Sequence, residues 1–581
     1  MKNRRKRGGG GDVVSWSRFF WCVVLFIISF VVFSGSFFFR GKFHPVVRSA
    51  LRSPASRVIS GNSNAPATVV SIREAVKLPD QTLVFLKYPP SARLFSKEDL
   101  LCVFSAAADS SQLKKPPSAV ENDGLGGQVV RCPETPRGHS VSLVVPRSTA
   151  DVRLLAGPTH EWDLLVFDAV IDYDNSTVVF VKGLNLRPGK VADVSRYECV
   201  YGWDFTKPNQ LLRSELISAA QEIVRCRTPL SVLDGPRSTQ EPVKVSIRIK
   251  GGGLLPSTAH PDRFPGRVKD PTQSRPFNMC ACTMTRNAAA FLREWVMYHA
   301  RIGVQRWFIY DNNSDDDIIS EIENLEKLGY NISRHLWPWI KTQEAGFAHC
   351  AIRARSDCDW VAFIDVDEFF YLPSRLTLPD IIRNYSASGE IGELRTSCHS
   401  FGPSGLRDQP RGGVTVGYTC RMALPERHKS IVRPESLNAT LINAVHHFHL
   451  RDGVEFADVD MGMMVINHYK YQVWEVFKEK FRRRVATYVA DWQEEENIGS
   501  KDRAPGLGTR PVEPPDWAER FCEVRDTGLR DWVLENLRDY KTQRLMWEKE
   551  KEGFGRVEDE VSVEMGSWTH KRRRKHKLKA H

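Results

Sequence analysis

The sequence predicts an α/β domain preceded by a β-rich, sandwich-like module and a single N-terminal transmembrane helix. Residues 19–39 form one long apolar run, short β-rich runs separated by turn residues fill the region from about 82 to 250, and strand and helix patterns alternate from Phe277 onward. With 581 residues, 41% of them hydrophobic, the chain is long enough for two packed domains and tails.

The apolar run 19–39 contains 21 residues without a charge and is long enough to cross a bilayer as a helix. It is longer and bulkier than the core of a cleaved signal peptide, so we interpret it as an anchor. The tail 1–18 holds six Lys or Arg and one Asp, which predicts a cytosolic tail and a lumenal remainder. Five Asn-x-Ser/Thr triplets suit this topology, at Asn175, Asn312, Asn331, Asn384 and Asn438.

The net charge of +12 is confined to the two tails. Residues 1–18 carry +5 and residues 571–581 carry +7, so the remainder is formally neutral. A neutral body offers no basic surface for following a phosphate backbone, and we therefore expect no nucleic-acid partner.

The region before the α/β domain divides into a stem, a β-rich module and a linker. Residues 40–75 are rich in Ser, Pro and Arg, which is typical of a stem; residues 76–250 form the β-rich module, and 251–276 form a linker rich in Gly, Pro and Ser. Disulfides between Cys102 and Cys132 and between Cys199 and Cys226 are compatible with this module, although the sequence alone does not decide them.

The domain 277–500 alternates strands and helices. Strands are expected at 278–284, 306–310, 332–337 and 360–364, with helices at about 288–299, 318–325 and 343–355. Ser314 and Asp317 stand three positions apart, which predicts a capping box at the start of the second helix. Residues 501–581 then form a helical extension and a basic tail.

Polar residues follow the ends of these strands. In doubly wound sheets ligands bind beyond the carboxyl ends of the strands, and Arg286, Asn287, Asp311 and Asn313 are placed there to read a base and a ribose. Asp365 and Asp367 follow the apolar run 360–364, and alternate carboxylates at a strand end can hold a divalent cation that also binds a diphosphate. No phosphate-binding glycine loop is present in the sequence.

Eleven cysteines lie on the predicted lumenal side, so at least one thiol stays unpaired. Cys280 and Cys282 share a face of one strand, but no second Cys or His pair with zinc-site spacing follows them. We interpret both, and His349 with Cys350 on the predicted helix, as packing residues.

An ordered series of motifs resembles glycosyltransferase family 92, which includes the plant β-1,4-galactan synthases. The motifs are 282–287 (CTMTRN), 294–299 (EWVMYH), 310–314 (YDNNS), 343–350 (QEAGFAHC) and 360–369 (WVAFIDVDEF). The resemblance covers roughly residues 275–500. It implies a GT-A type, Rossmann-like glycosyltransferase domain, a UDP-sugar donor, dependence on Mn²⁺ (or Mg²⁺), inversion at the anomeric carbon and a single-pass type II protein of the Golgi membrane.

From this resemblance we expect transfer of a hexose, galactose from UDP-galactose in the first instance, to a polysaccharide or glycan, with the β-1,4-galactan of pectin as the best guess. The β-rich module resembles the carbohydrate-binding module of the galactan synthases in position and strand content only. Acceptor identity and the formation of homo-oligomers are left open.

Individual roles follow the same resemblance. Asp367 is expected to bind the metal directly, while Asp365 contacts it through water or binds the ribose. His468 matches the family's metal-binding histidine, with His446, His447 and His449 as competitors for that role. Lys429 is a candidate for contacting the diphosphate. The catalytic base is left open among four acids, Glu426, Asp452, Asp408 and Glu455.

Two other functions compete with transfer. The first is a carbohydrate-binding membrane protein whose transferase domain is inactive, against which the intact Asp365-x-Asp367 pair argues. The second is a glycoside hydrolase, but its two carboxylates must flank a glycosidic bond, about 5–10 Å apart. Asp365 and Asp367 stand two residues apart at one strand end, which favours a shared ion.

Overall fold

The computed structural model describes residues 70–480 and 513–548, apart from short gaps at 90–91, 107–111, 124–125, 147–151, 185, 187–189, 235–241, 265–274 and 387–388. The predicted cytosolic tail, the anchor 19–39 and nearly all of the stem lie outside these residues. Among the residues described, no helix combines the length and the apolar character needed to cross a membrane.

The β-rich region forms two sandwiches where the sequence predicted one. One sheet of the first sandwich has the strand order β5 (Ala119–Asn122), β6 (Gln128–Pro133), β2 (Gln81–Lys87), β1 (Ser71–Lys77) and β9 (Thr159–Glu161). Its other sheet has the order β4 (Gln112–Lys115), β3 (Leu101–Ala106), β7 (His139–Val145) and β8 (Val152–Arg153). Its core lies between the sheets, where the Cys102–Cys132 disulfide joins β3 to β6. Because β1 begins at Ser71, the predicted stem was drawn about five residues too long.

The second sandwich repeats this plan. One sheet has the strand order β10 (Leu165–Ile171), β11 (Ser176–Lys182), β15 (Ile223–Arg227) and β14 (Leu216–Ala220). The other has the order β13 (Leu212–Ser214), β12 (Tyr197–Gly202), β16 (Lys244–Ile249) and β17 (Gly253–Leu254). The short helix α2 (Leu230–Leu233) follows β15 in the chain. The Cys199–Cys226 disulfide joins β12 to β15, so both predicted pairings are confirmed. Ser257 and Ala259 also pack here, so the predicted linker 251–276 starts too early.

One sheet of each sandwich is buried on two faces, the sheet of β1, β2 and β6 in the first and that of β10, β11 and β15 in the second. On β11, Val179 and Val181 face the core of the second sandwich, while Val178 and Phe180 pack into a core that also contains residues of the α/β domain. Alternate side chains of a strand point to opposite faces, so this double burial means that the α/β domain covers the outer face of one sheet in each sandwich.

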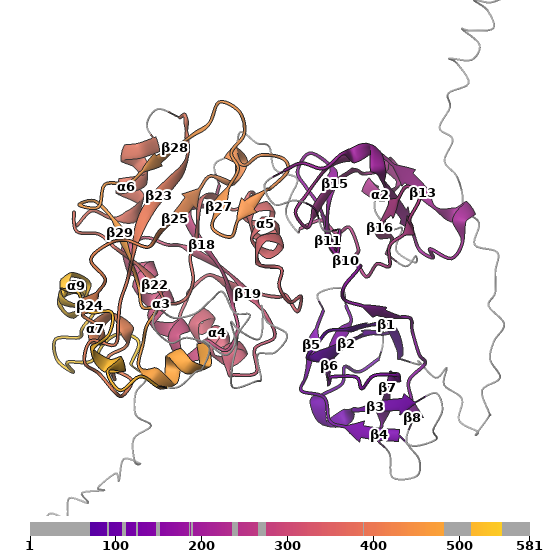
Figure 1. The fold of residues 1–581 in the computed structure, drawn as a ribbon, viewed down its shortest axis with the longest axis horizontal. Helices are drawn as coiled ribbons and strands as arrows, with labels where there is room; N and C mark the ends of the chain where they lie inside the picture. Colours follow the sequence, from indigo (N-terminus) through magenta and orange to yellow (C-terminus); the bar gives the residue numbers. More distant parts are fainter. Residues whose placement is uncertain are drawn as a thin grey trace, which may run out of the picture. The chain divides into compact units, whose positions relative to one another are not determined.

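The series of strands and helices predicted for the α/β domain is confirmed. It runs β18 (Phe277–Thr285), α3 (Ala289–Ile302), β19 (Arg306–Asp311), α4 (Ile318–Lys327), β20 (Ile332–Leu336), α5 (Gln343–Ala354) and β21 (Cys358–Phe363). The strands pair in parallel in the order β20-β19-β18-β21. Residues of α3 and α4 pack on one face of this sheet and those of α5 on the other (Figure 1).

A second half extends the sheet beyond β21. It contains β25 (Arg427–Val432), β23 (Ile391–Ser400), β29 (Val465–His468) and β22 (Glu368–Tyr371), with β28 (Glu455–Asp458) beside β23. Helix α6 (Leu378–Ser386) follows β22, and the short hairpin of β26 (Asn443–Ala444) and β27 (His447–Phe448) follows β25. This arrangement, a parallel half continued by mixed strands, is the α/β fold that the GT-A prediction describes.

The described part of the C-terminal extension, 513–548, packs on the α/β domain. Strand β30 (Val524–Arg525) pairs with β24 (Cys420–Arg421), and the Cys420–Cys522 disulfide lies beside them. Helix α9 (Gly528–Asn536) contacts α7 (Val414–Gly417), and both lie near β24 in Figure 1. The extension is therefore partly strand, where the sequence predicted helix.

Two local predictions were wrong. Cys280 is bonded to Cys358 and Cys282 to Cys350, so these residues staple β18 to β21 and to α5 in place of simple packing. The capping box is also absent: α4 begins at Ile318 without a side-chain cap, and Ser314 Oγ accepts the N–H of Asn287. Cys398 is the single free thiol among the described cysteines, consistent with the odd count.

Candidate active site

The polar residues after β18, β19 and β21 meet at one edge of the sheet. Thr285 at the end of β18 lies beside Asp311 at the end of β19, and Cys282 lies beside Phe363 at the end of β21. Asp365 follows Phe363 by two residues and therefore reaches the same carboxyl edge. This is the position in which open α/β sheets bind their ligands.

Asp367 and His468 form the centre of the site. The antiparallel pairing of β22 with β29 sets Glu368 opposite His468, which brings His468 Nε2 within 3.3 Å of Asp367 Oδ2. Adjacent ligands of an octahedral cation stand about 3 Å apart when each lies about 2.1 Å from the ion. The ammonium group of Lys480 forms an ion pair with the same Asp367 oxygen.

Charge at this position is strongly stabilised. Burial of Asp367 acts to raise its pKa, but the ammonium of Lys480 and, after it, the His468 ring outweigh burial and hold the pKa well below its usual range. Asp367 is 9% exposed, and so its carboxylate is both enclosed and ionised.

Asp365 has a different environment. Its carboxylate, about one third exposed, lies 3.3 Å from Lys429 Nζ and 3.6 Å from His446 Nε2. Burial again acts to raise its pKa, but Lys429 and His446 together lower it. Asp365 is therefore ionised and open on the side that does not contact Lys429.

Lys429 holds the acids in place from inside the fold. Its ammonium lies 2.7 Å from Glu368 Oε1 and donates to His446 Nε2 at 2.5 Å, while His446 Nδ1 donates to the carbonyl of Phe363 at 2.7 Å. Burial acts to lower the pKa of Lys429, but Glu368 and Asp365 raise it above its usual value. The structure thus places Lys429 beneath the carboxylates, not facing outward toward a diphosphate.

Glu368 is a site residue that the sequence reasoning missed. It is fully buried, it pairs with Lys429, and its Oε2 accepts the backbone N–H of Asp365 at 3.0 Å. That bond fixes the turn between the two aspartates. The signal was present in the sequence, because Glu368 directly follows Asp367 in the acidic run.

Asp311 and Asn313 serve the loop after β19. Asp311 is fully buried, where Arg334 Nε donates to its carboxylate at 2.8 Å and the N–H of Ser314 donates at 3.0 Å. Asn313 donates from Nδ2 to the carbonyl of Pro338 at 2.9 Å. Both side chains hold the loop through bonds inside the protein. The described contacts therefore do not support the prediction that Asp311 and Asn313 bind the base or ribose.

Arg286 and Asn287 lie closer to solvent. The guanidinium group of Arg286 is 3.8 Å from Asp80 and from Asp315, and its side chain is 36% exposed. Asn287 has a positive φ of 53° and its Oδ1 accepts the N–H of Asp315 at 2.7 Å. Among the predicted nucleotide contacts other than Asp365, Arg286 is the one with a charged group open to a ligand.

The first sandwich reaches this loop. Arg131 on β6 is buried and donates to the carbonyls of Asn313 and Ser314 at 3.2 and 2.9 Å. Glu121 on β5 forms an ion pair with Arg334, the partner of Asp311. The β-rich module therefore fixes the conformation of the loop at the edge of the sheet.

Glu426 is the base candidate that lies near the acids. It accepts a hydrogen bond from Lys470 Nζ at 2.7 Å, and Tyr471 Oη lies 3.4 Å from its other oxygen. Burial acts to raise the pKa of Glu426, but Lys470 lowers it, with a smaller contribution from His468. Glu426 is therefore ionised at neutral pH beside the histidine.

Asp452 and Glu455 are placed elsewhere. Glu455 pairs with Ile391 at the start of β23, whereas His468 pairs with Ser400 at its end. Nine residues of strand separate these positions, about 30 Å at 3.3 Å per residue. Asp452 precedes β28 at the same remote end, so the structure does not support it as the base; Asp408 is exposed on a loop.

The competing histidines have other partners or positions. His447 Nδ1 forms a hydrogen bond with Ser430 Oγ at 2.7 Å and lies 3.5 Å from Glu393 Oε1. His449 is exposed. His446 touches Asp365 but is engaged through both ring nitrogens. His468 is thus the described histidine that lies on Asp367, in the position the family resemblance indicated.

The donor atoms of Asp365, Asp367 and His468 suit a divalent cation. A set of carboxylate and imidazole ligands fits Mn²⁺ better than Mg²⁺, which prefers oxygen alone. Asp367 and His468 are the pair in contact, whereas the groups of three donors whose atoms all lie within 4.8 Å of one another among the described residues are Glu368 with Cys398 and His468, and Asp168 with His335 and His349. In the first, Lys429 already neutralises Glu368 and burial raises the pKa of the Cys398 thiol, so that group does not suit a metal.

The family profile for glycosyltransferase family 92 matches residues 275–498. A glycosyltransferase family 92 protein of Ricinus communis is 59% identical over 94% of this chain and 100% of its own length, and one of Oryza sativa is 51% identical over 89% and 91%. A third, from Arabidopsis thaliana, is 45% identical over 87% of this chain and 90% of its own.

Solved structures resemble the chain only in part. The Staphylococcus aureus protein TarS (residues 1–349) is 10% identical, with a TM-score of 0.22, over 37% of this chain and 66% of its own. Glucosyl-3-phosphoglycerate synthase of Mycobacterium tuberculosis is 12% identical, with a TM-score of 0.20, over 36% and 78%. Scores this low support no conclusion about function. The three plant relatives match this chain over 90% or more of their own length and show its family. The chain belongs to glycosyltransferase family 92.

Proposed function

We propose that this glycosyltransferase is a metal-dependent, inverting enzyme that transfers a hexose from a UDP-sugar to a polysaccharide or glycan. Galactose from UDP-galactose is the first candidate donor, and the β-1,4-galactan of pectin the first candidate acceptor, both from the family resemblance. The observation that carries the proposal is the 3.3 Å approach of His468 Nε2 to Asp367 Oδ2 at the carboxyl edge of a parallel sheet.

Asp365, Asp367 and His468 would hold the cation in this proposal. When bound, Mn²⁺ supplies positive charge that stabilises the departing diphosphate. Lys429 and Glu368 fix the turn that carries both aspartates, so the ligands are positioned before the donor arrives. Such positioning avoids reorganisation during the reaction.

Glu426 is the residue we assign to the acceptor side. Inversion requires a base that takes the proton of the acceptor hydroxyl as that oxygen attacks the anomeric carbon. Glu426 is ionised because Lys470 outweighs the effect of burial on its pKa, and its side chain is about one third exposed. The Glu426 carboxylate can therefore accept the proton of an acceptor hydroxyl that approaches from the solvent side.

Location in the secretory pathway is part of the proposal. The apolar run 19–39 and the basic tail before it favour a type II anchor, and the Golgi membrane follows from the family resemblance. Five disulfides among the described residues support an oxidising compartment for the folded part of the chain. The sheets of the sandwiches that do not pack on the α/β domain are the surface we propose for binding of the acceptor polymer.

The test is a panel of UDP-sugars offered to the purified protein with Mn²⁺ and mixed oligosaccharides, scored by the mass shift of the product. Transfer of one hexose, dependent on Mn²⁺, supports the proposal. The alternative, a carbohydrate-binding protein with an inactive transferase domain, predicts binding of the oligosaccharides with neither transfer nor hydrolysis of any UDP-sugar.

A further inference from the structure

Lys480 occupies an unusual position in the site. Its ammonium group forms an ion pair with Asp367 Oδ2, the same atom that lies 3.3 Å from His468 Nε2. The Lys480 side chain is one quarter exposed, so it lies over the carboxylate on the solvent side. Lys429, in contrast, is buried on the inner side of the acids.

The ammonium group stands where a bound cation would compete with it. Asp367 Oδ2 cannot hold a lysine ammonium and a divalent cation together without strong repulsion between the two positive charges. Binding of a metal to Asp367 and His468 therefore requires the Lys480 side chain to leave.

The backbone of Lys480 is held while its side chain can move. Residues 474–480 are helical, and Trp474 and Phe477 pack against Trp517, with ring centroids 5.2 and 4.6 Å apart from it. A lysine carries its charge on a flexible four-carbon chain, so the ammonium can shift by several ångströms from a fixed backbone.

We infer that Lys480 has two alternative partners: Asp367 in the metal-free enzyme, and the diphosphate of the donor once a divalent cation has taken Asp367. This inference rests on the proposed function. In the first state the ammonium neutralises Asp367 and competes with the metal; in the second it adds a positive charge to the diphosphate beside the metal. Metal and nucleotide then bind cooperatively, because the diphosphate offers the displaced ammonium a new anionic partner.

Two binding measurements on the full chain test the inference. Mn²⁺ binding without nucleotide is followed from the EPR signal of the free ion, and UDP binding at saturating Mn²⁺ is followed by calorimetry. The variants are Lys480→Met, which keeps the apolar stem, Lys480→Arg, which keeps the charge, and Lys478→Met as the matched control. Lys478 lies on the same helical segment but pairs with Glu475 at 4.0 Å.

Lys480→Met is expected to bind Mn²⁺ about fivefold more tightly than the wild type and UDP about tenfold more weakly, as expected for losing one charge partner in each state. Lys480→Arg and Lys478→Met should stay within about twofold of the wild type in both assays. Unchanged or weaker Mn²⁺ binding by Lys480→Met overturns the inference, and so does unchanged UDP binding. Absence of Mn²⁺ binding by the wild type overturns the proposed function as well.

Discussion

At the scale of single residues, two lysines neutralise three acids of the site from different sides. Lys429 neutralises Glu368 and Asp365 from inside, and this leaves Asp367 with partners on the solvent side only. A buried acid without a partner would become protonated, so Lys429 is what keeps Asp365 charged in a half-buried position.

Replacement of Asp367 by Asn should therefore abolish transfer without unfolding the protein. The amide is a poor metal ligand, and loss of the cation removes several kcal/mol of stabilisation from the departing diphosphate, so kcat/KM should fall by about a hundredfold or more. Steady-state rates on the best donor measure this, with circular dichroism as the check on folding. Asp452→Asn, at the remote end of β23, is the control and should retain wild-type rates; substantial turnover by Asp367→Asn would remove Asp367 from its role.

The residue contacts also show what the sequence could and could not predict about the site. Asp365, Asp367 and His468 were identified because an apolar strand ending in acids, and a histidine in a family position, are local patterns. The burial of Asp311 was not predictable in this way, since it depends on Arg334 from the neighbouring strand and on Glu121 from another module. The burial of Lys429 against Glu368, where the sequence made it a candidate for contacting the diphosphate, depends on distant segments in the same way.

At the scale of helices and strands, the parallel half of the sheet was predicted because its signals are strong. Strands β19 and β21 are largely apolar runs and the helices have regular apolar faces, as in α3 with Leu292, Trp295 and His299 all buried. The second half, β22 to β29, consists partly of four-residue strands whose pairing is set by distant segments. The same limit applies to Cys280 and Cys282, because spacing cannot reveal a disulfide partner about 70 residues away.

His299 on α3 gives the fold a dependence on pH. Burial lowers the pKa of His299 from 6.5 to about 3, and its ring stacks on Phe369. Below pH 6.5 the unfolded chain gains a proton at this residue that the folded chain does not, so stability falls as the pH falls. At about 1.4 kcal/mol per pH unit, this residue should lower the free energy of unfolding by about 2 kcal/mol between pH 6.5 and pH 5.

The measurement is urea denaturation followed by tryptophan fluorescence at pH 7, 6 and 5. His299→Gln should be less stable than the wild type at pH 7 but should lose less stability on acidification. His449→Gln, which changes an exposed histidine, should follow the wild-type profile. Parallel profiles for His299→Gln and the wild type would show that this residue does not carry the pH dependence.

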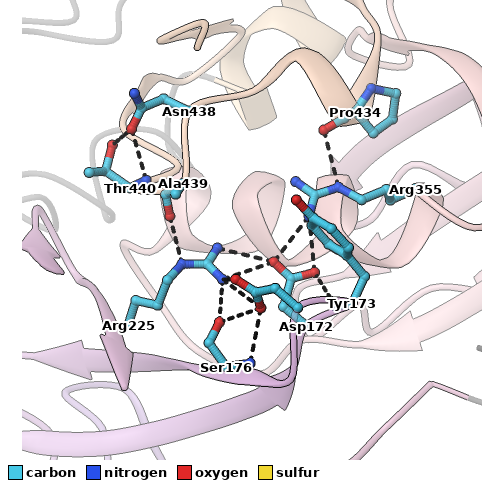
Figure 2. Close-up of polar contacts among 10 residues, drawn as sticks. Asp172, Tyr173, Ser176, Arg225, Arg355, Pro434, Asn438, Ala439 and Thr440 are labelled. Carbon is cyan, nitrogen blue, oxygen red and sulfur yellow. Dashed lines mark hydrogen bonds and ion pairs between the residues drawn. The ribbon is translucent and has the colours of Figure 1, made fainter. Parts of the chain in front are cut away.

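At the scale of the whole described chain, the β-rich module and the α/β domain share a core and a charged junction. Figure 2 shows Asp172, from the turn after β10, between Arg225 on β15 and Arg355 at the end of α5. Asp172 lies 3.0 Å from each guanidinium group, and Arg225 also donates to the carbonyl of Ala439 at 2.8 Å. Because Asp172 and Arg355 are both buried, removal of the Asp172 carboxylate would take away the acid that neutralises Arg355 inside the junction.

The same modular contact should affect donor binding through Arg131. Arg131→Met keeps most of the side-chain volume but removes the donors to the carbonyls of Asn313 and Ser314, so the loop after β19 loses its fixed conformation. UDP affinity in Mn²⁺, measured by calorimetry, should weaken by about tenfold, as expected for the loss of charged hydrogen bonds. Arg153→Met, on the exposed strand β8, is the control. Wild-type UDP affinity in folded Arg131→Met would mean that the module does not act on the nucleotide site.

The most direct test of the central claim is titration of UDP into the full-length protein, by calorimetry, in Mn²⁺ and again in EDTA. A cation held between Asp367 and His468 should give a one-to-one complex in Mn²⁺ that is lost in EDTA and lost in Asp367→Asn. Binding of UDP with equal affinity in EDTA, or by Asp367→Asn in Mn²⁺, would contradict a cation held between Asp367 and His468.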